Sequence, residues 1–318
     1  MQVDRLSERV GHDPAILNCI IMYTQEFFWT MNPLPTLIGL GEVLWDLLPA
    51  GPQVGGSPAN VVFHAGHLGL KGVLVSRCGA DDAGRQLRHQ LAGKGVSLEH
   101  LQVDPHHATG VAEVSLRSGE AHFEIRANAA WDYLEATDDV LTLAGGADGL
   151  CFGSLGQRHA VARASIRRIV ESTRPACVRC FDVNLRAPFY DRDSLLFGLE
   201  HATLLKCTSE EMQTLAQLFD VDGATALLRA FPLTTVVETS GAAGCRVTTR
   251  RECLSIPAPK VEVVDPVGAG DAFCAAFVAA LLQGRSIGVA ARAACRLGAL
   301  VVSQTGAMPA RGLIRQGV

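Results

Sequence analysis

Short apolar runs alternate with longer helix-forming runs along most of this 318-residue chain. Strand patterns occur at residues 37–41, 73–76, 149–152, 177–183, 203–206 and 234–238. Helix patterns occur at residues 60–68, 82–94, 159–171, 193–201 and 209–219. Strands that alternate with helices are usually parallel, because each helix carries the chain back to the edge where the previous strand began. The sequence therefore predicts an α/β fold with a doubly wound, mostly parallel sheet.

One region breaks this alternation. Apolar and polar residues alternate singly in 110–116 and again in 121–126, and the Ser-Gly-Glu of residues 118–120 is typical of a turn. This pattern predicts an antiparallel hairpin that projects from the main sheet. Together with residues 47–55 it would form a small β lid, with the second lid segment at about 107–128. A hairpin without function is the alternative, and an adjoining glycine-rich segment favours the lid.

Composition and charge limit the classes of function. Hydrophobic residues make up 48% of the chain and charged residues 19%, which is enough for a large core. A net charge of −4 gives no general attraction to nucleic acid or to anionic membranes. No apolar run approaches the roughly 20 residues that span a bilayer. The ten cysteines lack the spacing of a disulfide framework, so we expect reduced thiols in a cytoplasmic protein, with Cys177 and Cys180 packed in the core.

The first 33 residues differ from the rest of the chain. They contain broken apolar pieces and no small-residue cleavage site, unlike a signal peptide. Met31-Asn32-Pro33 would be a natural start for the domain that follows. We therefore expect residues 1–33 to be an N-terminal extension and residues 34–318 to form one domain.

Residues 264–271, with the sequence VDPVGAGD, are followed directly by the apolar run 272–282. That run is rich in Ala and Leu and predicts a helix that ends before Gly284. Unpaired N–H groups and the helix dipole make such an N-terminus a phosphate site, and glycines let the backbone approach the anion. Asp271, in the first turn, would repel phosphate. It either caps the helix or accepts a proton from a hydroxyl that attacks the phosphate.

A second glycine-rich segment, Gly55-Gly56-Ser57-Pro58-Ala59-Asn60, opens a predicted helix. Paired glycines permit close backbone approach, and Asn60 offers both a donor and an acceptor, which suits the hydroxyls of a sugar. Asp46 comes just after the first predicted strand, at the carboxyl end where open α/β sheets bind ligands. An ionised Asp46 can accept hydrogen bonds from two adjacent hydroxyls of a polyol.

Together these motifs resemble the ribokinase-like sugar kinases of the phosphofructokinase B type. Asp46, the 55–60 segment and the 265–271 segment occur in the order and spacing of that family, and the resemblance covers about residues 34–318. The sequences around Asp46 and in residues 181–190 are most similar to the fructokinase branch. The resemblance implies a ribokinase-like fold, ATP and Mg²⁺ as cofactors, and a sugar with a free primary hydroxyl.

The resemblance also implies roles for particular residues. Asp271 would be the catalytic base, and the backbone N–H groups of Gly268, Ala269 and Gly270 would hold the charge of the transferring phosphate. The expected sugar-binding residues are Asp46, Gly56, Asn60, Arg126 and Asn128. The expected nucleotide-binding residues are Asn184, Arg186, Thr208, Thr239, Gly241, Gly244, Gly268 and Gly270. The expected metal-site residues are Glu211, which would organise Mg²⁺ through water, and Asp265 and Val267, which would border a site for a monovalent cation such as K⁺.

One departure from the family concerns the metal. Relatives often have Lys-x-Asn-x-x-Glu where this chain has residues 206–211, and Thr208 replaces the Asn. Thr keeps one oxygen but lacks the amide, so the replacement bears on metal affinity. Mg²⁺ retains water and takes few direct protein ligands, so we expect the loss to be tolerated.

We therefore expect an ATP-dependent carbohydrate kinase, with the conversion of D-fructose to fructose 6-phosphate as the first expectation. Within the class, 2-keto-3-deoxygluconate kinase and ribokinase are alternatives. Outside it, the alternative is a catalytically weakened sugar- or nucleotide-binding regulator, which Thr208 alone favours. The expected partners are the sugar and ATP, without nucleic acid or membrane, and the alternating faces of the hairpin would suit pairing across a homodimer.

Overall fold

The computed structural model describes residues 33–48, 51–117 and 120–310 of the chain. Pro35–Val318 forms one compact unit, and Met1–Leu34 is assigned to another. The predicted extension, residues 1–33, lies almost wholly outside the described residues, so its assignment stays a prediction.

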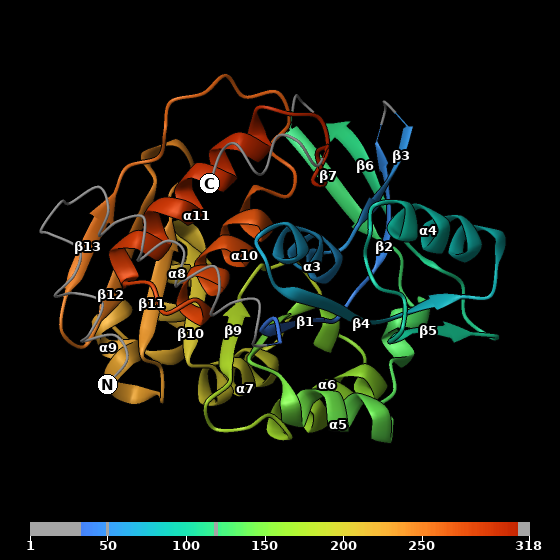
Figure 1. The fold of residues 1–318 in the computed structure, drawn as a ribbon, viewed down its shortest axis with the longest axis horizontal. Coiled ribbons are helices and arrows are strands. Elements are labelled where there is room, and N and C mark those ends of the chain that lie inside the picture. Colours follow the sequence, from blue (N-terminus) through green and yellow to red (C-terminus); the bar gives the residue numbers. More distant parts are fainter. Residues whose placement is uncertain (1–32, 49–50, 118–119, 311–318) are drawn as a thin grey trace, which may run out of the picture. The chain divides into compact units, whose positions relative to one another are not determined.

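The centre of the fold is a nine-stranded sheet with the order β13-β12-β11-β10-β9-β8-β1-β4-β5 (Figure 1). Its strands are β1 (Thr36–Leu40), β4 (Lys71–Gly79), β5 (Leu101–Asp104), β8 (Gly149–Gly153), β9 (Val178–Asp182), β10 (Leu204–Thr208), β11 (Thr235–Thr239), β12 (Cys245–Thr249) and β13 (Cys253–Ile256). Each neighbouring pair from β11 to β5 is parallel, whereas β12 and β13 add antiparallel strands at one edge. The prediction of a doubly wound, mostly parallel sheet is confirmed. Because parallel strands share one carboxyl edge, the loops that leave them emerge on the same side.

Helices cover both faces of this sheet. One face carries α3 (Ser57–His67), α4 (Asp82–Gly93), α10 (Ala269–Leu282) and α11 (Ile287–Val302). The other carries α5 (Asp138–Gly146), α6 (Ala160–Glu171), α7 (Arg192–His201), α8 (Ser209–Phe219) and α9 (Gly223–Ala230). Successive strand residues alternate between the two cores, so that Leu37 faces the first and Ile38 the second. Burial on both faces explains why these strands are apolar throughout.

The helix α10 is apolar on every side. Its residues 272–280 are all buried, because α10 packs against the sheet and against α3 and α11 (Figure 1). A helix of this composition is stable only in an interior position. Its N-terminus is thereby held at the carboxyl edge of the sheet, as the sequence predicted. Although α10 is so apolar, no helix in the described part of the chain has both the length and the hydropathy needed to cross a bilayer.

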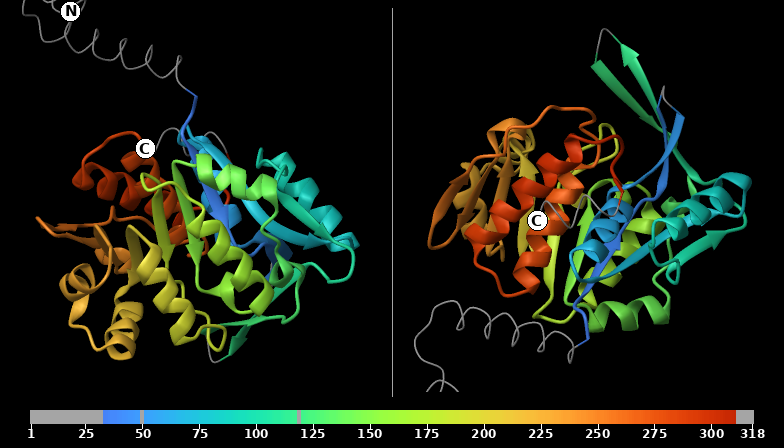
Figure 2. Two further views of the ribbon diagram at one scale, coloured as in Figure 1. Left: turned by 90° about the horizontal axis from the view of Figure 1, so that it is seen from below. Right: turned by 45° about the horizontal axis from the view of Figure 1, so that its top comes forward.

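A second, smaller sheet has the order β3-β2-β6-β7 and stands out from the main body (Figure 2). Its strands are β2 (Leu44–Leu48), β3 (Gly51–Gly55), β6 (Gly110–Arg117) and β7 (Glu120–Ile125). The antiparallel pairing of β6 with β7 confirms the predicted hairpin, and β2 and β3 complete the sheet with it. β2 and β6 run parallel, so this sheet is mixed.

The helix α3 begins at Ser57, earlier than the sequence pattern indicated. Gly56 precedes it with a φ of 104°, and Pro58 occupies the first turn. Proline favours this position because its fixed φ suits a helix and its missing N–H would be unpaired there. The early start brings the Ser57 side chain onto the same helix end as Asn60.

Candidate active site

Predicted site residues from distant parts of the sequence meet at the carboxyl edge of the main sheet. They border a pocket of about 300 Å³. Its lining residues are Glu42, Leu44, Asp46, Gly56, Ser57, Asn60, Ala112, Ile125, Leu155, Asp182, Asn184, Arg186, Lys206, Pro266, Val267, Gly268, Gly270 and Asp271. The small sheet supplies the apolar residues Leu44, Ala112 and Ile125 and one charged residue, Asp46. The other charged groups come from the main sheet, the start of α10 and the loops that follow β1 and β9.

Asp271 lies in the first turn of α10, and its carboxylate accepts two hydrogen bonds from α3. The Ser57 hydroxyl donates to Oδ1 at 2.6 Å, and the Asn60 amide donates to Oδ2 at 2.7 Å. The N-terminus of α10, at Gly268, has no side-chain cap among the described residues. The carboxylate therefore does not cap its own helix. It borders the pocket, which favours contact with a ligand over a purely structural role.

Two glycines shape the turn before α10. Gly268 has a φ of 80°, and a Cβ at this position would overlap the Cβ of Ala307. A Cβ on Gly270 would lie 3.1 Å from Nζ of Lys206. The first N–H groups of a helix have no partner within the helix, and here no side chain of the described residues caps them. Unpaired donors at a glycine turn, reinforced by the helix dipole, make this a suitable site for an anion.

Asp46 lies on β2, in register with Gln53 of β3. A Cβ on the adjacent Gly55 would overlap the Asp46 carboxylate, so this glycine is needed for the carboxylate to fit. Burial raises the pKa of Asp46 to about 6, and the negative charge of Asp271 adds to the shift. No donor among the described residues bonds to this carboxylate, which leaves its oxygens available to the hydroxyls of a ligand.

Glu42 is a buried carboxyl group to which the sequence analysis gave no role. Only 4% of the residue is exposed, and its Oε1 accepts a hydrogen bond from the Ser57 backbone N–H at 3.3 Å. Burial raises the pKa of Glu42 to about 7, and the charge of Asp271 contributes. The sequence did hold a signal for this residue, because an acid that closely follows a buried strand lies at the carboxyl edge of the sheet, where ligands bind.

The shifted pKa of Glu42 gives a test of this environment. In the folded chain Glu42 keeps its proton from pH 4.5 up to about 7, whereas the unfolded chain releases it, so this group lowers the free energy of unfolding as the pH rises through that window. We expect Glu42→Gln to remove this penalty. From about pH 5 to about pH 8, the unfolding free energy of the variant should rise relative to wild type by about 2 kcal/mol. Urea denaturation at both pH values measures the change, and parallel pH profiles for the two proteins would contradict the assignment.

An ion pair that the sequence analysis did not identify lies at the inner end of the pocket. Asp182 ends β9, and Lys206 lies on the neighbouring strand β10. Lys206 Nζ is 2.9 Å from Oδ1 and 3.1 Å from Oδ2 of Asp182. Both residues are buried and both border the pocket. Their charge within mostly apolar strands could have marked them, but the sequence does not show that β9 and β10 are neighbours.

Asn184 and Arg186 follow β9 and line the same pocket. Asn184 has a φ of 39°, an unusual value for a residue other than glycine, and such backbone conformations often accompany functional sites. Two of the predicted nucleotide-binding residues are thus brought next to the Gly268 turn and to Asp271.

Four other predicted nucleotide-binding residues, Thr208, Thr239, Gly241 and Gly244, lie at the same sheet edge but outside the pocket lining. Thr208 ends β10, Thr239 ends β11, and the two residues pair in register. The 3₁₀ turn η3 (Gly241–Ala243) then leads into the antiparallel strand β12. Gly241 and Gly244 have φ values of 51° and 96°, so the turn requires glycine at both positions. The predicted nucleotide turn is therefore also a hairpin turn.

The predicted metal residue Glu211 forms a capping box with Thr208 at the start of α8. Thr208 Oγ1 accepts from the Glu211 N–H at 3.1 Å, and Glu211 Oε2 accepts from the Thr208 N–H at 2.8 Å. Glu211 Oε1 accepts from the Leu185 N–H at 2.7 Å. No group of three or more His, Cys, Asp or Glu side chains in the described ranges could enclose a metal ion. Each oxygen of Glu211 keeps a second lone pair, which fits a hydrated Mg²⁺ held through water.

The carboxylate of Asp265 accepts hydrogen bonds from two backbone N–H groups. Its Oδ1 accepts from the Val267 N–H at 3.0 Å, and its Oδ2 accepts from the Gly306 N–H at 2.9 Å. The carboxylate thus ties the turn before α10 to the segment after α11. Whether a monovalent cation binds beside Asp265 and Val267 stays a prediction.

The structure does not bring Arg126 and Asn128 to the pocket. The guanidinium of Arg126 is exposed and forms an ion pair with Glu113 of β6. Asn128 borders a different hollow, together with Asp132. Ala112 and Ile125 are register partners that line the pocket. The residues that follow them, Glu113 and Arg126, point to the other face of the small sheet.

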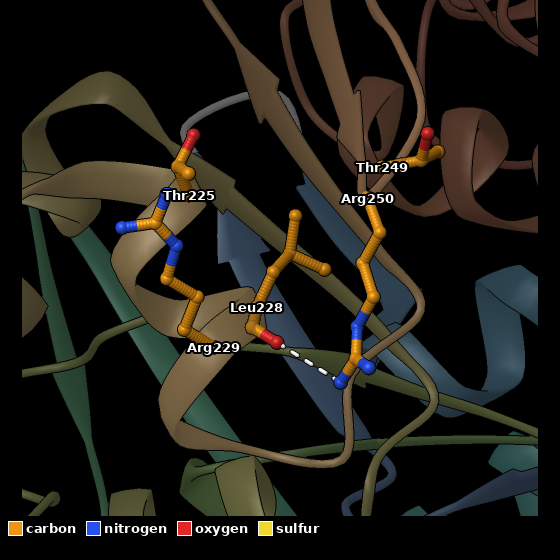
Figure 3. A pocket seen from close by; sticks show the side chains of 5 residues that line it. All are labelled: Thr225, Leu228, Arg229, Thr249 and Arg250. Atoms are coloured by element: carbon orange, nitrogen blue, oxygen red, sulfur yellow. Dashed lines mark hydrogen bonds between the residues drawn. The ribbon is translucent and has the colours of Figure 1, made fainter.

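A larger hollow, of about 410 Å³, lies between α9 and the end of β12 (Figure 3). Its lining residues are Thr225, Leu228, Arg229, Thr249 and Arg250. The Arg250 guanidinium donates a hydrogen bond to the Leu228 carbonyl at 3.1 Å, which closes one side. Thr249 pairs with Thr235, the first residue of β11, so this hollow lies at the opposite edge of the sheet from Asp271. It is not part of the candidate site.

Comparisons with known proteins agree with this geometry. The model of the pfkB family of carbohydrate kinases matches residues 51–311. A fructokinase from Klebsiella pneumoniae is 31% identical over 290 residues, which cover 85% of this chain and 94% of the relative. A fructokinase from Solanum tuberosum is 27% identical over 297 residues, which cover 86% of this chain and 92% of the relative.

A solved structure has the same architecture. The crystal structure of a fructokinase with bound ATP from Xylella fastidiosa superposes with a TM-score of 0.79 and 25% identity, covering 88% of this chain and 97% of that one. A mostly parallel sheet flanked by helices, with a small second sheet beside it, is the fold of a sugar kinase. The chain belongs to the pfkB family of carbohydrate kinases.

Proposed function

We propose that this kinase transfers the terminal phosphate of ATP to the primary hydroxyl of D-fructose, producing fructose 6-phosphate. The observation that carries the proposal is the meeting of Asp271 with the Gly268 turn in one pocket, opposite the free carboxylate of Asp46. The relatives named above are fructokinases, which supports fructose over other sugars. A kinase for 2-keto-3-deoxygluconate or ribose remains the second candidate, since the same pocket would admit those polyols.

In this mechanism Asp271 orients the primary hydroxyl and accepts its proton. The carboxylate accepts hydrogen bonds from Ser57 and Asn60 in the structure. On sugar binding, Asn60 would turn its amide to a sugar hydroxyl and free Oδ2 for the acceptor oxygen. Ser57 would keep Oδ1 in place. The transition state of phosphoryl transfer is loose, so positioning of this kind supplies much of the rate.

The phosphate that moves would lie at the turn formed by Gly268, Ala269 and Gly270. The N–H groups at the start of α10 would donate hydrogen bonds to its negatively charged oxygens. The rest of the nucleotide would extend along the sheet edge past Thr208 and Thr239 toward the hairpin of Gly241 and Gly244. Glu211 would hold Mg²⁺ through water, and the ion would supply positive charge against the phosphates.

The sugar would lie between Asp46 and the apolar residues of the small sheet. Leu44, Ala112 and Ile125 offer it no hydrogen bonds, so recognition of hydroxyls would fall to Asp46, Gly56 and Asn60. The small sheet would act as a lid that excludes water from the transfer. We further propose that residues 34–318 form one kinase domain with this lid. We also propose that the protein works in the cytoplasm and that the hairpin pairs two copies into a homodimer.

A coupled assay of ADP release over a panel of sugars tests the proposed function. We expect ADP release with fructose to exceed that with ribose and with 2-keto-3-deoxygluconate, and to depend on Mg²⁺. Product analysis should place the phosphate on the primary hydroxyl. If none of the sugars releases ADP above the rate without acceptor, the proposed function is wrong.

Asp46→Asn tests the sugar half of the site. The ionised carboxylate accepts hydrogen bonds more strongly than an amide, so we expect kcat/KM for the sugar to fall roughly 10- to 100-fold. The KM for ATP should change little. Glu113→Gln removes a carboxylate from the same sheet outside the pocket and serves as the matched control. Equal losses in the two variants would contradict a sugar-binding role for Asp46.

A further inference from the structure

The buried pair of Lys206 and Asp182 has a position that stability does not explain. Lys206 is 7% exposed and Asp182 is 5% exposed. Removing two charges from water costs several kcal/mol each, and apolar residues of similar volume often give a more stable protein than a buried ion pair. The pair also borders the candidate active site instead of the interior of a core. Its place at the pocket therefore favours a functional role for the pair.

The ammonium group of Lys206 lies directly beside the anion turn. A Cβ on Gly270 would lie 3.1 Å from Nζ, so only glycine leaves full room for this group. An ammonium group has three N–H donors. Two of them reach the oxygens of Asp182. The third has no partner among the described residues, at the point where Nζ meets the turn.

The surrounding charges are mostly negative. Asp271, Asp182 and Asp46 border the pocket together with the cation Arg186, and the charge of Glu211 also acts on Lys206. Burial alone would lower the pKa of Lys206, but the charge of Asp182 outweighs burial and the pKa is raised, so the ammonium stays protonated. A phosphate group that enters this pocket meets several carboxylates, and a fixed cation would offset their repulsion.

We propose that Lys206 is a phosphate-binding residue of this site, whose third N–H donates to the terminal phosphate of the nucleotide at the Gly268–Gly270 turn. Asp182 acts as its positioning residue, because it holds the ammonium against Gly270. This inference rests on the proposed function and extends it, since it assigns to a buried side chain part of the charge stabilisation otherwise left to backbone N–H groups.

A simpler alternative is that Lys206 only neutralises Asp182. The two explanations predict different results for a variant that lacks both charges. If neutralisation is the whole role, Lys206→Met is harmful but Lys206→Met combined with Asp182→Asn restores function. If Lys206 binds phosphate, the double variant stays impaired, because the ammonium group beside Gly270 is gone and Arg186 is the one other cation in the described pocket lining.

The experiment measures binding of ADP and of a non-hydrolysable ATP analogue by calorimetry, for wild type, the two single variants and the double variant. We expect the wild type to prefer the analogue over ADP. Lys206→Met and the double variant should lose roughly tenfold or more of that preference, while their affinity for ADP stays within about twofold of wild type. Lys206→Arg, which keeps the charge, should retain part of the preference.

Thermal unfolding shows whether each variant is folded, and the double variant, which leaves no buried charge, decides the question if a single variant is unstable. A double variant with the wild-type preference and wild-type turnover would overturn the proposal. The outcome is separable from that of the proposed function. If the wild type shows a Lys206-dependent preference for the triphosphate but phosphorylates no sugar, the proposed function fails and the role of Lys206 stands.

Discussion

Asp271→Asn should lower kcat by about 10²- to 10⁴-fold, the usual range for removal of a general base. The amide keeps the size of the side chain and can still bond to Ser57 or Asn60, but it cannot accept a proton from the sugar hydroxyl. Affinity for ATP should persist, because the backbone N–H groups of the Gly268 turn are unchanged. Steady-state kinetics and nucleotide titration together measure both effects.

The matched control for this variant is Asp265→Asn. It removes a carboxylate from the same segment, but one whose oxygens are bonded to the N–H groups of Val267 and Gly306. An effect on stability with a smaller loss of kcat is expected there. If Asp271→Asn turns over at nearly the wild-type rate, the assignment of the base is wrong.

Gly268→Ala should be the second most damaging change. Alanine would have to adopt a φ near 80°, and its Cβ would overlap that of Ala307. The turn must shift to relieve the overlap, which moves the N–H groups away from the phosphate. Loss of one such donor typically costs roughly 10²- to 10³-fold in kcat. The strained backbone should also cost about 1–3 kcal/mol of stability.

Gly284→Ala separates these two effects. Gly284 lies beyond the other end of α10 with a φ of 71°, and a Cβ there would meet no atom within 4 Å. We expect a stability cost of about 1–2 kcal/mol from the left-handed backbone, with unchanged kcat. Chemical denaturation and steady-state kinetics on both variants provide the comparison. Equal turnover in both would show that the Gly268 turn does not hold the transferring phosphate.

The sheet could be predicted from the sequence because its strands are buried on both faces. A strand such as β1 or β10 is mostly apolar for this reason. In the helices between the strands, apolar residues recur three or four positions apart, which is the period of a helix. The antiparallel edge strands β12 and β13 were missed. They are only five and four residues long and partly exposed, and segments this short carry too few residues to establish a strand pattern.

The candidate site was predictable where one short segment carries all the needed chemistry. The Gly268 turn and Asp271 are contiguous, and so are Gly56 and Asn60. Lys206 and Asp182 were not predicted, because they are a pair only after β9 and β10 lie side by side. Arg126 was predicted near the sugar from the family resemblance, whereas in the structure its guanidinium forms an exposed ion pair with Glu113.

The bonds from Ser57 and Asn60 to Asp271 join residues that are 214 and 211 positions apart in the chain. Almost the whole chain must therefore be synthesised before Asp271 can form these hydrogen bonds with Ser57 and Asn60. Contacts between such remote partners form late, since a long loop must close first. Activity should consequently appear only with the last step of folding, which makes the appearance of turnover during refolding a sensitive report that the first and last thirds of the domain have met.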